Sequence, residues 1–242
     1  MISLFAAGRA YDRTTSRKAR QTRTLDTRPH AVPASPVSQS VTRGLAVCAV
    51  VAGPLFLVVG VAQGLAREGF DFTRNAISQL ALGATGWIQT VSFLLAGALL
   101  IAGAVGLRRL LRGGPGGTWG PVLVGVFGAS FWAAAAFPAD AGTGFPVGAP
   151  EATAMRGHGT VHMLAGMVGY LALCAAFVVL ARPLATGADQ GWAVATRLVP
   201  LVVLTGFAAS AASVLAFTVG AGLGLLWLAA VTARLVTVSE RA

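Results

Sequence analysis

Acidic side chains are scarce in this sequence, which has 8 Asp and Glu against 18 Lys and Arg, and charged residues make up 11% of its 242 residues. Soluble globular domains carry about 25% charged residues. The charges gather in short clusters between apolar stretches of about 20 residues, the length that spans the hydrocarbon core of a bilayer. With 55% hydrophobic residues and a mean hydropathy of +0.74, the chain is expected to be an integral membrane protein.

Cysteine, lysine and ionisable residues within the apolar stretches are also nearly absent. The two cysteines, Cys48 and Cys174, both fall inside apolar stretches, so neither a disulfide framework nor a cysteine zinc cluster is expected. The single lysine, Lys18, precedes the first stretch, so no retinal Schiff base can form within a span. Apart from Arg234, the predicted spans contain no charged residue, which argues against proton relays, ion-coupled transporters and voltage sensors.

The apolar stretches predict an all-α, polytopic membrane bundle of six transmembrane helices. Residues 1–43 are expected to form a disordered, basic cytoplasmic tail, residues 44–236 the transmembrane domain, and residues 237–242 a short cytoplasmic C-terminal tail. The expected spans are residues 44–66, 88–107, 121–137, 161–181, 198–214 and 218–236.

The last two spans come from one long apolar run. The chain carries no charge for 36 residues between Arg197 and Arg234, which is too long for one span and just enough for two. A tight turn is expected near Phe217 and Gly220, because glycine favours turns.

Lys and Arg are distributed unevenly between the two sides of these spans. One side holds 15 of them and the other holds three, Arg67, Arg74 and Arg156. Because cytoplasmic loops retain Lys and Arg, both termini are expected in the cytoplasm, with the protein in the cell (cytoplasmic) membrane. Eight basic residues lie in the tail among Ser, Thr and Pro with few aromatic residues, which favours anionic lipid as partner over nucleic acid. No protein partner can be named.

Polar residues gather in two loops on the predicted extracytoplasmic side. In the first loop, Asp71, Asn75 and Ser78 would fall on one face of a helix, with Arg74 beside them. This pattern predicts a short amphipathic helix in the membrane interface. The alternative is a capped re-entry helix anchored by Trp87.

The second loop ends in two histidines. His158 and His162 are four residues apart, the spacing of a two-histidine metal pair, and Asp140 would be a third ligand for a divalent metal such as zinc. Asp71 would be a base or a further ligand. Two alternatives stay open: a purely structural polar cluster, in which His162 bonds Asp140 or a loop carbonyl, and a binding pocket for an unidentified ligand.

The same loops carry motifs that resemble a known family. The stretches are residues 70–83, 86–89, 106–109, 137–140, 144–146 and 158–162. Together they resemble the bacterial multi-pass membrane family of unknown function catalogued as domain of unknown function 998, over roughly residues 44–236. The resemblance implies a six-span bundle in the cytoplasmic membrane and implies no reaction. The connection between the last two spans is shorter here than is usual in that family.

The expected function is non-enzymatic: an envelope protein that binds a small molecule or lipid, or supports a partner. Its polar extracytoplasmic cap would consist of Asp71, Arg74, Asn75, Ser78, Asp140, His158 and His162. One alternative is a membrane-embedded, metal-dependent hydrolase acting on lipid, in which Asp71 or Ser78 takes part in the chemistry. Another is a facilitator of a neutral or apolar solute. A support protein would be closely packed, whereas a facilitator needs a continuous polar cavity.

Overall fold

The computed structural model describes residues 36–150, 157–185 and 187–240. Within them the chain forms six α-helices, three short 3₁₀ helices and no strand. The α-helices are α1 (Pro36–Ala66), α2 (Gly86–Leu110), α3 (Trp119–Ala136), α4 (Gly157–Leu180), α5 (Gln190–Ala208) and α6 (Val214–Ser239). The 3₁₀ helices are η1 (Ile77–Ala81), η2 (Gly187–Asp189) and η3 (Ala209–Ala211). Residues 1–35 and 241–242 of the predicted tails, and Arg156, lie outside the described residues.

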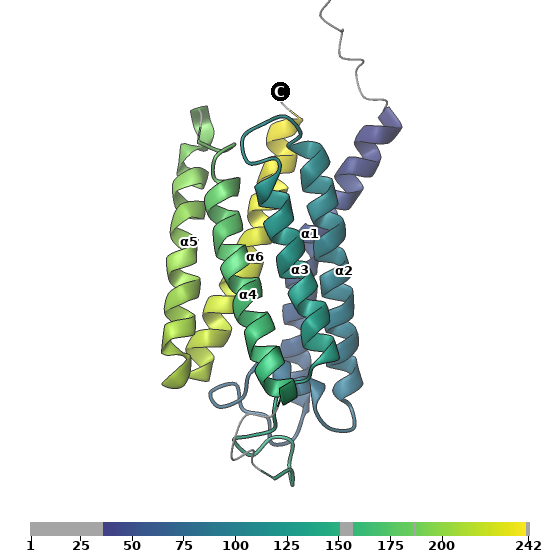
Figure 1. The fold of residues 1–242 in the computed structure, drawn as a ribbon, viewed down its shortest axis with the longest axis vertical. Coiled ribbons are helices and arrows are strands. Elements are labelled where there is room, and N and C mark those ends of the chain that lie inside the picture. The colour runs from purple at the N-terminus through teal and green to yellow at the C-terminus, as the bar shows by residue number, and fades with distance from the viewer. Residues whose placement is uncertain (1–35, 151–156, 186, 241–242) are drawn as a thin grey trace, which may run out of the picture. The chain divides into compact units, whose positions relative to one another are not determined.

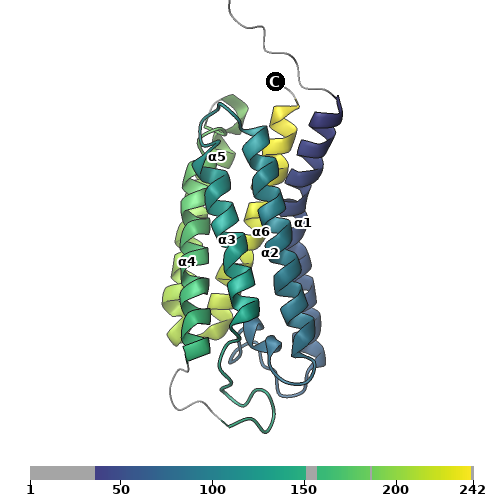
Figure 2. The same cartoon turned by 45° about the vertical axis from the view of Figure 1, so that its right-hand side comes forward.

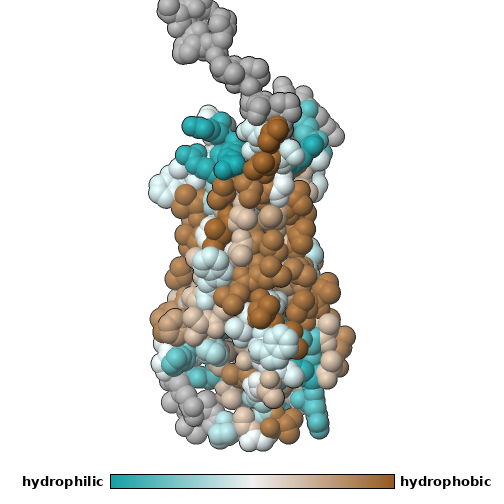
Figure 3. Space-filling view, turned by 90° about the vertical axis from the view of Figure 1, so that its right-hand side faces the viewer, coloured by the Kyte–Doolittle hydropathy of each residue, from teal (hydrophilic) through white to brown (hydrophobic). Residues whose placement is uncertain are grey.

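All six α-helices are long and apolar enough to cross a membrane. The shortest, α3, has 18 residues, which at a rise of 1.5 Å per residue span about 27 Å of a hydrocarbon core about 30 Å thick. Figure 3 shows apolar residues over the middle of the visible face and hydrophilic residues at both ends. The chain is therefore a multi-pass membrane protein, and the predicted all-α bundle of six spans is confirmed.

Several helix boundaries differ from the sequence prediction, most of all at the start of α1 and at both ends of α5, which was expected at residues 198–214 and runs Gln190–Ala208. Residues 36–43, which were expected to belong to the tail, form the start of α1. The turn between the last two spans consists of η3 and the residues that follow it, and does not lie near Phe217 and Gly220. The cause is a helix cap, since the Ser213 hydroxyl accepts the Ala216 backbone N–H at 3.2 Å and starts α6 there.

The helices pack mainly against their neighbours in the chain. α1 to α4 pack in chain order, α6 packs against α1, and α5 packs against α6 (Figures 1 and 2). α4 contacts α5 and α6 much less extensively than it contacts α3. The start of α1 and the end of α6 lie at one end of the bundle, the terminus end. Residues 67–85 and 137–150 form two loops at the opposite end, the loop end.

The closest contacts between helices occur at glycines, because glycine has no side chain to keep the two backbones apart. A Cβ atom on Gly106 of α2 would collide with the backbone nitrogen of Ala46 in α1. Between α5 and α6, a Cβ atom on Gly206 would lie 3.1 Å from the Cα of Gly220. Gly220 therefore serves helix packing and not a turn. Such close approach matters in lipid, where apolar side chains gain little by leaving the surrounding hydrocarbon.

Polar contacts join helices at the terminus end. Arg234 of α6 donates from Nε to Oδ1 of Asp189 at 2.8 Å, and the rings of Trp192 and Trp227 stack with centroids 5.5 Å apart. These contacts hold the start of α5 against α6. The one charged residue that the sequence places in the predicted spans is thus paired, as expected for a charge at membrane depth.

We predict that Gly106→Ala lowers the melting temperature of the detergent-purified protein, because the added methyl group overpacks the α1–α2 contact at a cost of about 1–3 kcal/mol. Gly125→Ala is the matched control, since its Cβ would meet Ala104 at an ordinary 3.8 Å and alanine favours a helix by about 0.5–1 kcal/mol. The melting temperatures of both variants are measured by circular dichroism during heating. Equal melting temperatures for the two variants would contradict the close contact.

Candidate functional site

The two loops at the loop end are hydrogen-bonded to each other and are called the joined loops. Asn75 is completely buried between them. Its Nδ2 donates to the Thr143 hydroxyl at 2.7 Å, and its Oδ1 accepts the Asp71 backbone N–H at 3.0 Å. Gln79 Nε2 donates to the Asp140 carbonyl at 3.1 Å. Buried amides need such partners, so these bonds fix the loops relative to each other.

Arg67 forms a second set of contacts within the joined loops. Its guanidinium donates to the carbonyls of Leu80 at 2.6 Å and Leu82 at 2.7 Å, and it lies 4.8 Å from the centre of the Phe145 ring. Phe145 is buried and also contacts Phe70 edge to face at 5.2 Å. Partial burial lowers the pKa of Arg67 from its ordinary value. The guanidinium thus holds the Leu80 and Leu82 backbone of the first loop near the Phe145 ring of the second.

The residues before η1 form turns instead of the predicted amphipathic helix. The Asp71 carboxylate accepts the Thr73 hydroxyl at 2.7 Å and the Thr73 backbone N–H at 2.8 Å, and these bonds lower the pKa of Asp71. Asp71 and Arg74 are exposed, Asn75 is buried, and Ser78 lies in η1 and is half-buried. Among these described residues, no shared helical face unites the four side chains as the sequence analysis expected.

The two histidines and Asp140 lie near the start of α4. His158 is exposed beside the Phe137 ring, whereas His162 is buried with its Nδ1 2.9 Å from the Phe137 carbonyl oxygen. The Asp140 carboxylate packs against Gly159, where a side chain would collide with it. Across the described part of the chain, no group of three or more His, Cys, Asp or Glu side chains is placed to hold a metal ion. The three predicted ligands are therefore not assembled as a metal site.

Several residues that join the loops were not singled out from the sequence, namely Arg67, Gln79, Thr143 and Phe145. The turn around Thr143 has a local signal in the sequence, because Thr143 is followed by a glycine, Gly144, and glycine readily adopts a positive φ. In the structure, φ is 53° at Thr143 and 82° at Gly144. Gln79 has no such signal, because its partner Asp140 lies 61 residues away in the sequence.

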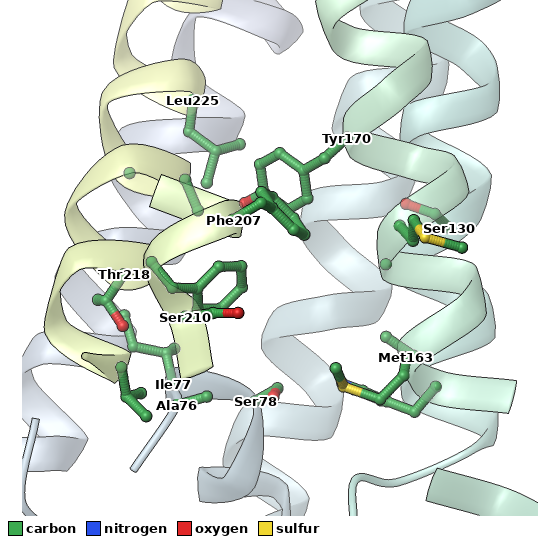
Figure 4. A pocket seen from close by; sticks show the side chains of 18 of the residues that line it. Ala76, Ile77, Ser78, Ser130, Met163, Tyr170, Phe207, Ser210, Thr218 and Leu225 are labelled. Atoms are coloured by element: carbon green, nitrogen blue, oxygen red, sulfur yellow. The ribbon is translucent and has the colours of Figure 1, made fainter. Parts of the chain in front are cut away.

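A cavity of about 330 Å³ lies between α4, η1 and the α5–α6 turn. Figure 4 shows η1 at its loop-end side, α4 on one side, and η3 and α6 on the other. Apolar and aromatic side chains predominate in the lining, among them Phe56, Phe93, Phe131, Phe207, Phe217 and Leu225. Its polar lining side chains are Ser78, Ser130, His162, Tyr170, Ser210 and Thr218. Of the described residues that line it, none is Asp, Glu, Lys or Arg.

The cavity opens at the side of the bundle. Met163 and Met167 of α4 line it and are 60% and 46% exposed. Ser210 and Ala211 of η3 also line it and are exposed. The mouth therefore lies between α4 and η3, on the surface that faces lipid and where α4 has few contacts with α5.

The family model described as "Protein of unknown function (DUF998)" matches residues 50–238. The chain belongs to this family. The resemblance predicted from the loop motifs is thereby confirmed. No curated protein and no solved structure matches the chain. In this DUF998 protein, the joined loops and all residues that line the cavity lie within the matched range.

We predict that Asn75→Asp loosens the joined loops, because the substitution replaces the donor that faces Thr143 and Gly142 with an acceptor. Loss of a buried hydrogen bond that leaves a polar group unsatisfied costs about 1–3 kcal/mol. Faster hydrogen exchange in residues 137–150 is the measurement. The control is Glu68→Gln, which replaces a carboxylate with an amide at an exposed position of the same loop. It should leave hydrogen exchange in residues 137–150 unchanged. Unchanged exchange in Asn75→Asp would show that the bond does not hold the loops.

Proposed function

We propose that this protein binds a lipid-like small molecule in the cavity, without catalysing a reaction on it. The observation that carries the proposal is an apolar, aromatic lining that opens at the lipid-facing side of the bundle. The volume of about 330 Å³ falls within the range of about 300–1,000 Å³ typical of small-molecule sites. A ligand dissolved in the bilayer can enter without crossing water.

A purely supporting role fits the cavity less well. Such a protein gains from close packing throughout, and a space left unfilled in a protein core costs about 24 cal/mol per Å³. A cavity of this size is therefore expected to hold a ligand or a lipid chain. This favours the binding role over the supporting one.

The two other functions need features that the cavity does not offer. A metal-dependent hydrolase needs its metal ligands together, and the described lining has no carboxylate to orient His162 as a base. A facilitator needs a path to the terminus end. Beyond the cavity in that direction, Leu173, Leu228 and Val231 are almost completely buried in the bundle. Binding without reaction or passage is the function we favour.

The proposal includes an orientation in the cell membrane, with both termini cytoplasmic and the joined loops extracytoplasmic. Arg108 and Arg109 lie in the last turn of α2 and Arg112 lies just after it, at the terminus end, the side that carries most of the basic residues. On the other side, the Arg67 guanidinium donates hydrogen bonds to the Leu80 and Leu82 carbonyls within the joined loops.

We predict that a membrane-impermeant maleimide applied to intact cells labels Val147→Cys and does not label Thr118→Cys. Val147 is 63% exposed in the joined loops, and Thr118 is exposed between α2 and α3. Both variants should react after the cells are permeabilised. The unmodified protein controls for Cys48 and Cys174. Labelling of Thr118→Cys alone in intact cells would reverse the orientation.

We predict that a long-chain alkane carrying a diazirine labels the lining residues Met163 and Met167 saturably when the protein is in phospholipid nanodiscs. Gly166→Leu should weaken this saturable labelling by about tenfold or more, because an isobutyl group would overpack an occupied cavity at a cost of about 1–3 kcal/mol. A Cβ on Gly166 meets no atom within 4 Å, so the helix itself should tolerate leucine. Peptide mapping by mass spectrometry measures the labelling.

Gly191→Leu is the matched control, because Gly191 also lies in a helix, meets no atom within 4 Å and does not line the cavity. Its labelling should equal that of the unmodified protein. If the unmodified protein shows no saturable labelling at the cavity, or if both leucine variants behave alike, the cavity is not a binding site for an alkyl chain.

A further inference from the structure

The cavity extends from the loop end to about the middle of the bundle. Its lining residues on α4 begin at His162 and end at Tyr170, about 8 Å and 20 Å from the start of the helix. On α6 they begin at Val214, the first residue of the helix, and end at Leu225, about 17 Å along it. One leaflet contributes about half of a hydrocarbon core about 30 Å thick. The cavity therefore lies mainly at the depth of the leaflet at the loop end.

The Tyr170 side chain closes the inner end of the cavity. Its ring centroid lies 5.2 Å from that of Phe127 on α3 and 5.1 Å from that of Phe207 on α5, so the ring reaches from α4 to two other helices. Helical side chains tilt toward the N-terminus of their helix, which for α4 is the loop end. Figure 4 shows Tyr170 and Leu225 at the end of the cavity farthest from η1. A chain that enters from the loop end therefore meets the Tyr170 ring.

Beyond Tyr170, the helices around the cavity close on one another. A Cβ atom on Gly224 of α6 would lie 3.0 Å from a side-chain atom of Val203 on α5 and 3.3 Å from one of Leu173 on α4. Val203 and Leu173 are completely buried. Leu173 follows Tyr170 by three residues, which is less than one helical turn. A smaller residue at position 170 would therefore lengthen the cavity by no more than about one turn.

The outer end of the cavity has small side chains at its mouth. Residues 209–213, between α5 and α6, are all Ala or Ser. Ser210 and Ala211 belong to this turn, line the cavity and are exposed. The turn lies at the start of α6, near the level where lipid chains meet their head groups. An amphiphile can therefore insert its chain from the side and keep its head group in the interface.

We propose that the cavity takes up the alkyl chain of a single-chain amphiphile, whose head group stays at the loop-end interface, and that Tyr170 limits the length of this chain. The volume of about 330 Å³ lies near the lower limit of the range of about 300–1,000 Å³ for small-molecule sites, which fits one chain better than two. This inference rests on the proposed function, because it names the class of ligand for the same cavity.

The length of the chain decides how well it fills the cavity. Lipid tails are as apolar as leucine, so a chain gains little by exchanging the bilayer for an apolar wall. It does gain contacts where it fills space that is otherwise empty, because atoms beside a void have no partner on one side. A chain that is too long must overpack the site or fold back on itself. Affinity should therefore rise with length until the chain reaches Tyr170 and fall beyond it.

The test is a competition between chains of different length. Saturable labelling by a dodecane diazirine in nanodiscs is competed with lysophosphatidylcholines that carry octanoyl, lauroyl, palmitoyl or arachidoyl chains, at equal mole fraction in the bilayer. The lauroyl chain is about as long as one leaflet is thick. With the unmodified protein, we expect competition to increase from octanoyl to lauroyl and to fall about tenfold from lauroyl to palmitoyl.

Three variants test the role of Tyr170. Tyr170→Leu removes the ring and should let palmitoyl compete as well as lauroyl, while arachidoyl stays weak because Leu173 and Val203 close the bundle beyond. Tyr170→Phe is the matched control, because it keeps the ring and should keep the preference for lauroyl. Leu225→Ala removes bulk at a similar depth from α6 and should act like Tyr170→Leu. Melting temperatures show which variants are folded, so Leu225→Ala decides if Tyr170→Leu is not.

Equal competition by lauroyl and palmitoyl with the unmodified protein would overturn the length limit and leave the binding role standing. An unchanged preference for lauroyl in the folded Tyr170→Leu or Leu225→Ala variant would overturn the role of Tyr170, and so would loss of the preference in Tyr170→Phe. If the unmodified protein shows no saturable labelling at all, the proposed function itself fails.

Discussion

Every polar group at membrane depth must find its partner inside the protein, because hydrocarbon offers none and an unsatisfied group costs several kcal/mol. Helices meet this demand for the backbone. Side chains meet it by reaching other helices: Gln63 of α1 donates to Gln89 of α2 at 2.7 Å, and the Trp132 indole of α3 donates to the Leu94 carbonyl of α2 at 3.0 Å. The demand is not met everywhere, since four buried side-chain atoms among the described residues have no hydrogen-bond partner, namely Gln63 Oε1, Gln89 Nε2, Thr218 Oγ1 and Thr232 Oγ1.

The cavity exists because α5 packs more extensively on α6 than on α4. At the terminus end, the Arg234–Asp189 pair holds α5 to α6, and nearer the loop end the two helices approach through Gly206 and Gly220. α4 is left with few contacts on that side, and the α5–α6 turn becomes one wall of the open space. The joined loops complete the enclosure, because η1, held by Asn75 and Arg67 and their partners, covers the loop-end side.

The fold was largely predictable, and the site was predictable only in part. Six apolar stretches predict six helices because span length and hydropathy are local properties. Polarity also marked the right loops, and within them Asn75, Ser78 and His162 matter to the structure or the cavity. The spacing of His158 and His162 predicted a metal pair, but no group of three or more possible ligands is assembled among the described residues, because a four-residue spacing fixes direction along a helix and says nothing of a third ligand. The turn between the last two spans was wrongly placed near Gly220, because glycine permits both turns and close helix contacts.

By itself the sequence determined that the chain is a six-span helical membrane protein, because length, hydropathy and charge along one segment suffice for that. It also carried the family motifs, which are read one position at a time. Only the tertiary structure decided that Phe56, Thr218 and His162 face one space, since they come from α1, α6 and α4 and no local pattern links them. It also decided which polar side chains are satisfied, because a hydrogen bond across 61 residues of sequence depends on how the helices pack.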